Sequence, residues 1–174
     1  MHNLREEHRG CVATIGSFDG VHLGHQAIVE QIKERARRYA LPSVVVMFEP
    51  QPREYFSREQ APARLMRLRE KIDALLDAGV DRVVCLQFNR AMRSLTAQQF
   101  IDDLLIAGIG IKCLVIGDDF HFGCDRKGDF AMLREVGANH DFEVVATETV
   151  KADQARVSST RIRAELEAGH FDAA

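Results

Sequence analysis

The sequence predicts an α/β fold in which a parallel β-sheet is covered by helices on both faces. Short runs rich in β-branched residues alternate along the chain with segments of helical periodicity. One of these runs, SVVVMF at 43–48, is rich in β-branched residues throughout its centre, which is typical of a strand buried on both faces. This alternation favours parallel strands that are joined by crossover helices.

The first unit is a strand at 11–15 followed by a helix at 23–40. The strand is the apolar run CVATI. In the helical segment, Ile28, Ile32 and Ala36 recur every four positions, which places them on one apolar face. We therefore expect this helix to pack against the sheet.

The second unit begins with the strand at 43–48. Pro50 and Pro52 follow it and predict an extended loop, because a proline disfavours helical backbone in the residue before it. The next helix is expected over 64–78, with Gly79 at the position of a C-terminal cap. Its apolar side consists of Leu65, Leu68, Ile72 and Leu75.

The rest of the chain repeats the same alternation. Further strands are expected at 82–88, 112–117 and 142–148. Thr96 opens a capping box of the form T-x-x-Q, which predicts a helix that runs to about Ala107. The remaining helices are expected near 129–137 and within 156–169, where a strand end precedes the helix.

The composition predicts one cytoplasmic domain over residues 1–174. A net charge of −3 excludes a general basic surface for nucleic acid. The polar amino end does not resemble a signal peptide, and no apolar stretch approaches the roughly 20 residues of a membrane span. The cysteines form no C-x-x-C pair, which disfavours disulfides and a structural zinc site; they are Cys11, Cys85, Cys113 and Cys124.

The segment GSFDGVHLGH, at 16–25, combines glycines and histidines where a strand gives way to a helix. Ligands of parallel sheets bind at the carboxyl ends of the strands, which also selects 117–123 and 157–163. A helix N-terminus attracts anions, so histidines in its first turn indicate a phosphate site. Two alternatives remain, which are a zinc site and a tight turn with surface histidines. The segment lacks the patterns of a P-loop and of a dinucleotide-binding turn.

Individual residues of this segment have distinct expected roles. Gly16 and Gly20 would allow positive φ and close approach of the backbone to a phosphate. His22 and His25 would both point toward an anion that is held there. In the zinc alternative, Asp19 is the nearby candidate for a third ligand.

The segment SSTRIR, at 158–163, is a second candidate for phosphate binding. Hydroxyl groups at a helix start can cap the helix or reach phosphate oxygens. Arg161 and Arg163 are two positions apart, so they point to different sides of a helix. One of them can then donate to a polyphosphate. The alternative is an ordinary capped helix with surface arginines.

Two aromatic segments follow predicted strands. In GDDFHFG, Asp119 and Phe120 can contact the edge and face of a flat ring, or the aromatic side chains can belong to the core. In FEPQPREYF, at 48–56, the aromatics can form a pocket wall or pack internally. We interpret two basic runs, RLREK at 67–71 and KERARR at 33–38, as solvated helix faces.

Taken in order, six motifs resemble the prokaryotic FAD synthetases, which are bifunctional riboflavin kinases/FMN adenylyltransferases. The motifs are TIGSFDGVHLGH, FEPQPREYF, RLREK, LTAQQFI, VIGDDFHFG and RVSSTRIR. The resemblance extends from about residue 10 to 170. More broadly, H-x-G-H with S-S-T-x-x-R is similar to the nucleotidyltransferase superfamily, whose fold is a Rossmann-like parallel sheet with helices on both faces.

The resemblance implies that AMP passes from ATP to the phosphate of FMN, with Mg²⁺ held mainly by phosphates. FAD and pyrophosphate would be the products. The implied catalytic residues are His22, His25 and Arg163. The implied ATP-binding residues are Gly16, Ser17, Phe18, Asp19, Gly20, Ser158, Ser159 and Thr160. The implied flavin-binding residues are Asp119, Phe120, Phe48 and Pro50.

The sequence also departs from the family pattern. Ser17 stands where asparagine is expected, and His121 stands where arginine is common. The β-barrel kinase module and a short strand before the first residues are not expected in these 174 residues. Two other functions are compatible with the motifs: a nucleotidyltransferase for nicotinamide mononucleotide or phosphopantetheine, and a binding module without catalysis.

Overall fold

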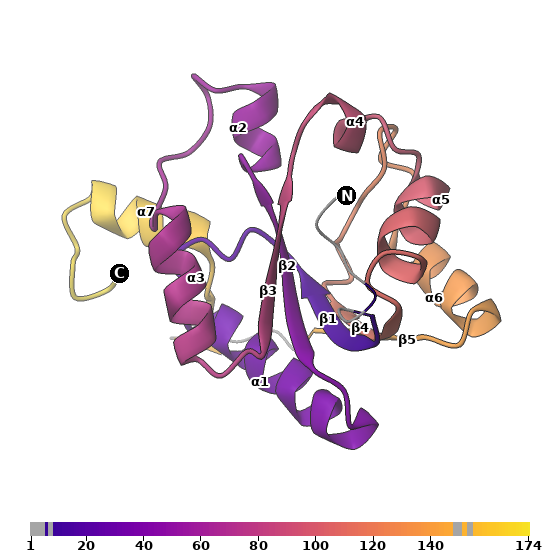
Figure 1. Ribbon diagram of the computed structural model, residues 1–174. Helices are drawn as coiled ribbons and strands as arrows, with labels where there is room; N and C mark the ends of the chain where they lie inside the picture. Colours follow the sequence, from indigo (N-terminus) through magenta and orange to yellow (C-terminus); the bar gives the residue numbers. More distant parts are fainter. Residues whose placement is uncertain (1–5, 7–8, 148–150, 153–154) are drawn as a thin grey trace.

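The computed structural model describes residues 6, 9–147, 151–152 and 155–174. Its centre is a five-stranded parallel sheet with the strand order β3-β2-β1-β4-β5 (Figure 1). The strands are β1 (Cys11–Ile15), β2 (Ser43–Glu49), β3 (Arg82–Gln87), β4 (Ile111–Ile116) and β5 (Glu143–Ala146). The predicted parallel sheet is confirmed, and each of its strands lies at a predicted place.

Helices cover both faces of this sheet, as predicted (Figure 1). α1 and α3 pack on one face, and η2 and α6 pack on the other. The helices are α1 (Leu23–Tyr39), α2 (Pro52–Phe56), α3 (Leu68–Asp77), α4 (Arg90–Arg93), α5 (Ala97–Gln99), η2 (Phe100–Ile106), α6 (Phe130–Asn139) and α7 (Ser159–Glu167). A two-stranded antiparallel ribbon of β6 (Lys151–Ala152) and β7 (Ala155–Arg156) precedes α7. None of the helices described is long and apolar enough to cross a membrane.

The alternation of side chains along the central strands explains the two-sided core. Val12 packs with α1 and α3, whereas its neighbour Ala13 packs with η2 and α6. The same alternation holds for Cys113 and Leu114 in β4. All four of these side chains are fully buried, because a central parallel strand has no solvated face.

The segment after β2 differs from the predicted extended loop. The Glu49–Pro50 peptide bond is cis, and Pro52 is the first residue of the short helix α2. Proline is well tolerated at this position, because the first N–H of a helix has no partner within the helix. Gln51 and Glu54 complete a capping box at this helix start.

The helix predicted over 64–78 begins four residues later, at Leu68. The Asp19 carboxylate accepts hydrogen bonds from the backbone N–H groups of Leu65 and Met66, at 3.1–3.2 Å. This tertiary contact holds both residues outside the helix. At the other end, Gly79 follows the cap with φ +87°, as predicted.

The helix predicted from Thr96 forms, but most of it has π geometry. Thr96 Oγ1 accepts from the Gln99 N–H at 3.2 Å, which confirms the predicted capping box. Further along, the Ala107 N–H donates to the Asp102 carbonyl at 2.8 Å, a five-residue separation typical of a π-helix. The short helix α4 between β3 and Thr96 was not predicted.

The sheet topology defines where a ligand would bind. From β1 the chain crosses to β2 on one side, while β4 lies on the other side of β1. The loops after β1 and β4 therefore diverge and leave a crevice at the carboxyl ends of these strands. The segments 16–22 and 117–123 follow these two strands.

Candidate functional site

A cavity of about 510 Å³ lies at this edge of the sheet. Side chains from the loop after β1, the start of α1, the loop after β2, the loop after β4 and the start of α7 line it. The lining residues are Ser17, Asp19, His22, Gly24, His25, Ile28, Gln51, Arg53, Pro62, Asp119, Thr147, Val157, Ser158, Ser159, Thr160 and Arg163. The three segments selected from the sequence thus meet at one cavity.

His22 and His25 stack on each other in the wall of this cavity. Their ring centroids are 3.7 Å apart with an interplanar angle of 18°. The backbone sets this arrangement, because His22 is the N-cap of α1 and His25 lies in the first turn. Phe18 packs against the other side of this pair, with its ring centroid 4.9 Å from that of His25.

Burial keeps both imidazoles neutral. Burial, followed by the charges of His22 and Lys71, lowers the pKa of His25 from 6.5 to about 3. Burial also lowers the pKa of His22, although a backbone hydrogen bond and the Asp19 charge oppose the change. The Nδ1 atoms of both rings are buried and have no hydrogen-bond partner within the described residues. A neutral imidazole carries one N–H group, so each ring can donate one hydrogen bond to a ligand.

The backbone of the loop after β1 is left-handed at Phe18, Gly20 and Val21, with φ values of 48°, 91° and 37°. The prediction of positive φ is therefore confirmed for Gly20 and wrong for Gly16. Gly16 is needed for a different reason, because a Cβ there would lie 2.9 Å from the Phe18 ring. At Gly20, a Cβ would lie 2.9 Å from Leu65 Cδ1.

Asp19 connects three segments rather than facing a ligand alone. Its side chain is 3% exposed, and its carboxylate is paired with the Arg163 guanidinium and with backbone N–H groups before α3. Its backbone carbonyl accepts from Ser159 Oγ at 2.8 Å. Among the described residues, no three His, Cys, Asp or Glu side chains form a group that could hold a metal ion, which leaves the zinc alternative without a ligand set there.

The start of α7 is fixed by its own side chains. Ser158 is the N-cap, and its Oγ accepts from the Arg161 N–H at 3.2 Å. Arg163 Nε donates to the Ala63 carbonyl at 2.6 Å, so this arginine links α7 to both flanking loops. Thr160 is exposed and lines the cavity. The capping role considered for these hydroxyl groups is confirmed at Ser158, and their contact with phosphate oxygens stays a prediction.

The predicted flavin-binding residues do not all reach this cavity. Asp119 lines it. Phe120 stacks on Phe122 at 5.5 Å and packs against the core, and Phe48 packs on Phe88 at 5.8 Å. Pro50 lines a neighbouring cavity of about 490 Å³ beside α2.

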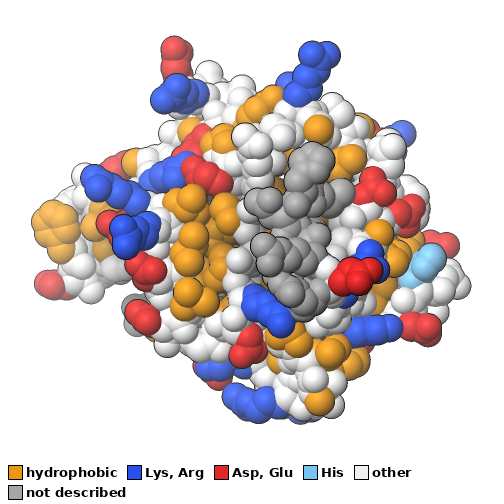
Figure 2. All heavy atoms as spheres, in the orientation of Figure 1, with side chains coloured by type: hydrophobic (Ala, Val, Ile, Leu, Met, Phe, Trp, Pro, Cys, Tyr) orange, Lys and Arg blue, Asp and Glu red, His pale blue; other side chains and the backbone are white. Residues whose placement is uncertain are grey.

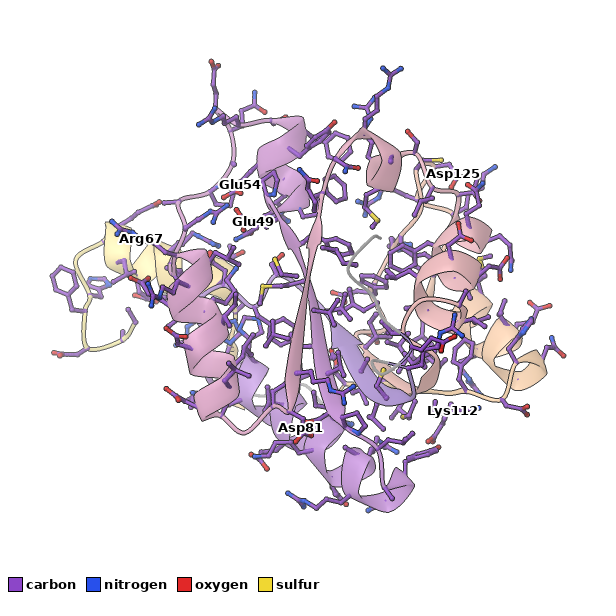
Figure 3. All side chains as sticks on the ribbon, in the orientation of Figure 1. Glu49, Glu54, Arg67, Asp81, Lys112 and Asp125 are labelled. Atoms are coloured by element: carbon purple, nitrogen blue, oxygen red, sulfur yellow. The ribbon has the colours of Figure 1, made fainter. Side chains whose placement is uncertain are left out.

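Glu54 and Arg64 also line that cavity. Arg64 Nη2 lies 2.6 Å from Glu49 Oε1 and 2.5 Å from Glu54 Oε2. Figure 3 shows these two glutamates close together, at the end of β2 and on α2. Tyr55 packs edge-on against Phe88 at 5.3 Å, and the Arg93 guanidinium lies 5.9 Å from the Tyr55 ring centroid.

Among the cavity residues that the sequence did not single out are Gln51, Arg53, Pro62 and Thr147. The first two belong to the FEPQPREYF motif, in which only the aromatic residues were interpreted as possible pocket residues. Gln51 Nε2 is buried without a hydrogen-bond partner in the described part of the chain. Lys71 was assigned to a solvated helix face, and this prediction is wrong because the residue is 1% exposed.

The remaining surface features agree with the composition. On the face shown in Figure 2, the basic and acidic side chains of the described residues are interspersed rather than gathered into one basic surface. All four cysteines are free thiols, of which Cys11 and Cys113 are buried.

Comparison with known proteins supplies independent information on the chain. The profile of a family described as FAD synthetase matches residues 4–161. The bifunctional riboflavin kinase/FMN adenylyltransferase of Pseudomonas fluorescens is 57% identical over 174 residues, which are 100% of this chain and 56% of that protein. The protein of the same description from Escherichia coli K12 is 47% identical over 95% of this chain and 53% of its own length. The chain thus spans about half the length of these relatives.

A solved structure has a similar fold. It is described as a macrolide-efflux protein from Streptococcus pneumoniae and superimposes with a TM-score of 0.78 at 29% sequence identity. The match covers 98% of this chain and 57% of that one.

Proposed function

Because this chain belongs to the FAD synthetase family, we propose that it is an FMN adenylyltransferase that acts on ATP and FMN. The observation that carries the proposal is the convergence of the stacked His22–His25 pair and the start of α7 on one cavity. The names of the relatives include a riboflavin kinase and an FMN adenylyltransferase activity, and we assign only the adenylyltransferase activity to residues 1–174. The cytoplasm, which holds both substrates, is the proposed location.

The reaction requires no nucleophile from the protein. An oxygen of the FMN phosphate attacks the α-phosphorus of ATP, and a new P–O bond forms to AMP. The bond between the α-phosphorus and its bridging oxygen to the β-phosphate breaks, and pyrophosphate leaves with that electron pair. Catalysis then consists of positioning the two phosphates and stabilising the charge that develops between them.

We assign that stabilisation to His22 and His25. Both rings are neutral and each can donate one hydrogen bond, which suits the oxygens of the reacting phosphates. Their position at the start of the 17-residue helix α1 adds the partial positive charge of a helix N-terminus. A neutral donor pair also avoids the repulsion that two stacked imidazolium ions would have.

The remaining assigned residues shape the nucleotide site. We assign Gly16, Ser17, Phe18 and Gly20 to the loop beneath the ATP, and the hydroxyls of 158–160 to its triphosphate end. Arg163 contributes mainly through placement, because its guanidinium is engaged by Asp19 and the Ala63 carbonyl. It thereby holds α7 against the loop after β1.

Mg²⁺ fits this site as an ion carried by the substrate. Magnesium commonly binds one or two carboxylates together with substrate phosphates rather than a cage of protein ligands. Asp119 is a carboxylate in the cavity wall that can contribute to such a site. When bound, the ion would neutralise charge on the phosphates.

The acceptor would enter from the side of Asp119 and the loop after β2. We keep Phe48, Pro50 and Phe120 as proposed flavin contacts, although the cavity wall does not include them. Pro50 is at the neighbouring cavity, and the two phenylalanines lie at the border of the core. A flavin ring would therefore extend beyond the 510 Å³ cavity toward this border.

The decisive experiment mixes the purified chain with FMN, ATP and Mg²⁺ and follows FAD and pyrophosphate. We expect both products in equal amounts, and their formation should require all three additions. Nicotinamide mononucleotide and phosphopantetheine are tested as alternative acceptors in parallel reactions. Turnover of one of these in place of FMN would contradict the proposed acceptor. Tight FMN binding without FAD formation would instead indicate a binding module.

A further inference from the structure

Lys71 lies in α3 with its ammonium group beneath the loop after β1. Its side chain is 1% exposed, although it belongs to the basic run RLREK. Neighbouring residues of the same helix, Arg67 and Arg69, are exposed. Figure 3 shows Arg67 at the outer side of the α3 start. A lysine is rarely buried to this degree unless its charge has a partner or a task.

The buried ammonium group contacts a residue that belongs to the candidate site. Lys71 Nζ donates to the backbone carbonyl of Ser17 at 2.7 Å. Burial and the nearby Arg64 charge lower the pKa of Lys71, while Asp19, Glu49 and Glu54 favour its charged form. Each of these three carboxylates has an arginine partner, since Asp19 pairs with Arg163 and both glutamates pair with Arg64. Lys71 therefore does not form a close ion pair with any of these three carboxylates.

The contact with Ser17 also fixes the orientation of a peptide group. In a trans peptide the C=O and the following N–H point in opposite directions. With the Ser17 carbonyl directed at Lys71, the Phe18 N–H is directed away from Lys71. Ser17 itself lines the cavity, and Phe18 packs on His25. A change at Lys71 would therefore alter both the position of Ser17 at the cavity and the packing of Phe18 on His25.

We propose that Lys71 is a positioning residue for the polyphosphate of the nucleotide. It acts in two ways: it orients the Ser17–Phe18 peptide, and it places a buried positive charge beneath the cavity wall. A charge in a poorly solvated position acts over a longer distance than one at the surface, because water does not screen it. This inference rests on the proposed function, because it requires a nucleotide phosphate in the 510 Å³ cavity.

The test compares Lys71→Met with Lys71→Gln and with the matched control Arg69→Met. Methionine keeps much of the length and apolar character of the buried chain but removes the donor and the charge. Glutamine retains a donor for the Ser17 carbonyl without a charge. Arg69→Met removes a cation of the same helix from an exposed position. Equilibrium binding of ATP and of adenosine is measured by calorimetry for the wild type and for each variant.

We expect Lys71→Met to weaken ATP binding by about tenfold or more, because a buried charge that faces several phosphate charges is lost. Adenosine binding should change by less than about twofold, since adenosine carries no phosphate. Lys71→Gln should lose less ATP affinity than Lys71→Met, because it keeps a donor for the Ser17 carbonyl but lacks the charge, and Arg69→Met should resemble the wild type. A purely structural lysine would not produce this difference between the two ligands.

Two results would overturn the inference. Equal losses for ATP and adenosine would show that Lys71 only maintains the fold of the loop. Wild-type ATP affinity in Lys71→Met would show that neither its charge nor its hydrogen bond matters, while leaving the proposed function intact. If the wild type itself bound no ATP, the proposed function and this inference would both be wrong. Urea unfolding of each variant shows whether a loss of binding follows from unfolding.

Discussion

Asp19 and Arg163 form a largely buried ion pair that joins the loop after β1 to helix α7. Their side chains are 3% and 14% exposed, and the residues are 144 positions apart in the chain. In addition, the Asp19 carboxylate accepts hydrogen bonds from the backbone N–H groups of Leu65 and Met66, just before α3. This pair therefore connects the two halves of the proposed nucleotide site.

Replacing Asp19 with asparagine should destabilise the protein by about 3 kcal/mol, since it leaves a partly buried guanidinium without its counter-charge. Urea unfolding measures the effect. Arg38→Ala is the control, because Arg38 and Glu34 form an ion pair with side chains that are 67% and 57% exposed. Removal of that surface pair should change stability by less than about 1 kcal/mol. Similar losses in both variants would contradict the role of the Asp19–Arg163 pair.

His25→Ala should lower the rate of FAD formation by more than about tenfold, because a lost donor to the developing charge costs on the order of 3 kcal/mol. Initial rates at saturating ATP and FMN measure the effect. The exposed His140 provides the control variant His140→Ala, which should retain the wild-type rate. Turnover near the wild-type value in His25→Ala would disprove the role that we assign to His25.

The stability of the protein should decrease as the pH falls from about 6.5. The unfolded chain protonates His25 near 6.5, whereas the folded protein keeps it neutral down to about 3. The unfolded state therefore binds more protons in this window, and the free energy of unfolding falls by about 1 kcal/mol per pH unit. Urea midpoints at pH 7 and pH 5 measure the slope, which should be smaller in His25→Gln. An equal slope in that variant would assign the pH dependence to other groups.

Gly20→Ala should destabilise the protein more than Gly169→Ala does. Both glycines have positive φ, at +91° and +77°, so both substitutions incur the backbone cost of about 1 kcal/mol. Only at Gly20 would the new Cβ meet another group, with Leu65 Cδ1 at 2.9 Å, whereas nothing lies within 4 Å at Gly169. Thermal unfolding compares the two variants. Equal losses would indicate that the loop after β1 moves to accommodate the methyl group.

Local patterns were sufficient to predict the sheet and most helices. The β-branched runs identified all five parallel strands, and the capping box at Thr96 located a helix start correctly. One prediction failed because a distant group decides the local structure. Asp19 delays the start of α3 by binding the N–H groups of two residues, and nothing within 64–78 indicates this contact.

The segments that line the cavity could be predicted from the sequence, but not every residue of the candidate site. The glycine-histidine segment and SSTRIR have unusual compositions, and they line the same cavity. Lys71 could not be recognised, because a lysine among other charged residues looks like a solvated one. Its burial depends on how α3 packs against the loop after β1, which is a tertiary property.

The position of α7 has a consequence for how the site assembles. Figure 1 shows this helix away from the central strands. Within the described part of the chain, side-chain contacts through Ser159 and Arg163 anchor α7 in the site, rather than a β-ladder with the sheet. Such an element can open as a separate cooperative unit while the sheet stays folded. A bound nucleotide would then slow the hydrogen exchange of the α7 amides. The amides of β1 would exchange only with global unfolding, whether or not nucleotide is bound.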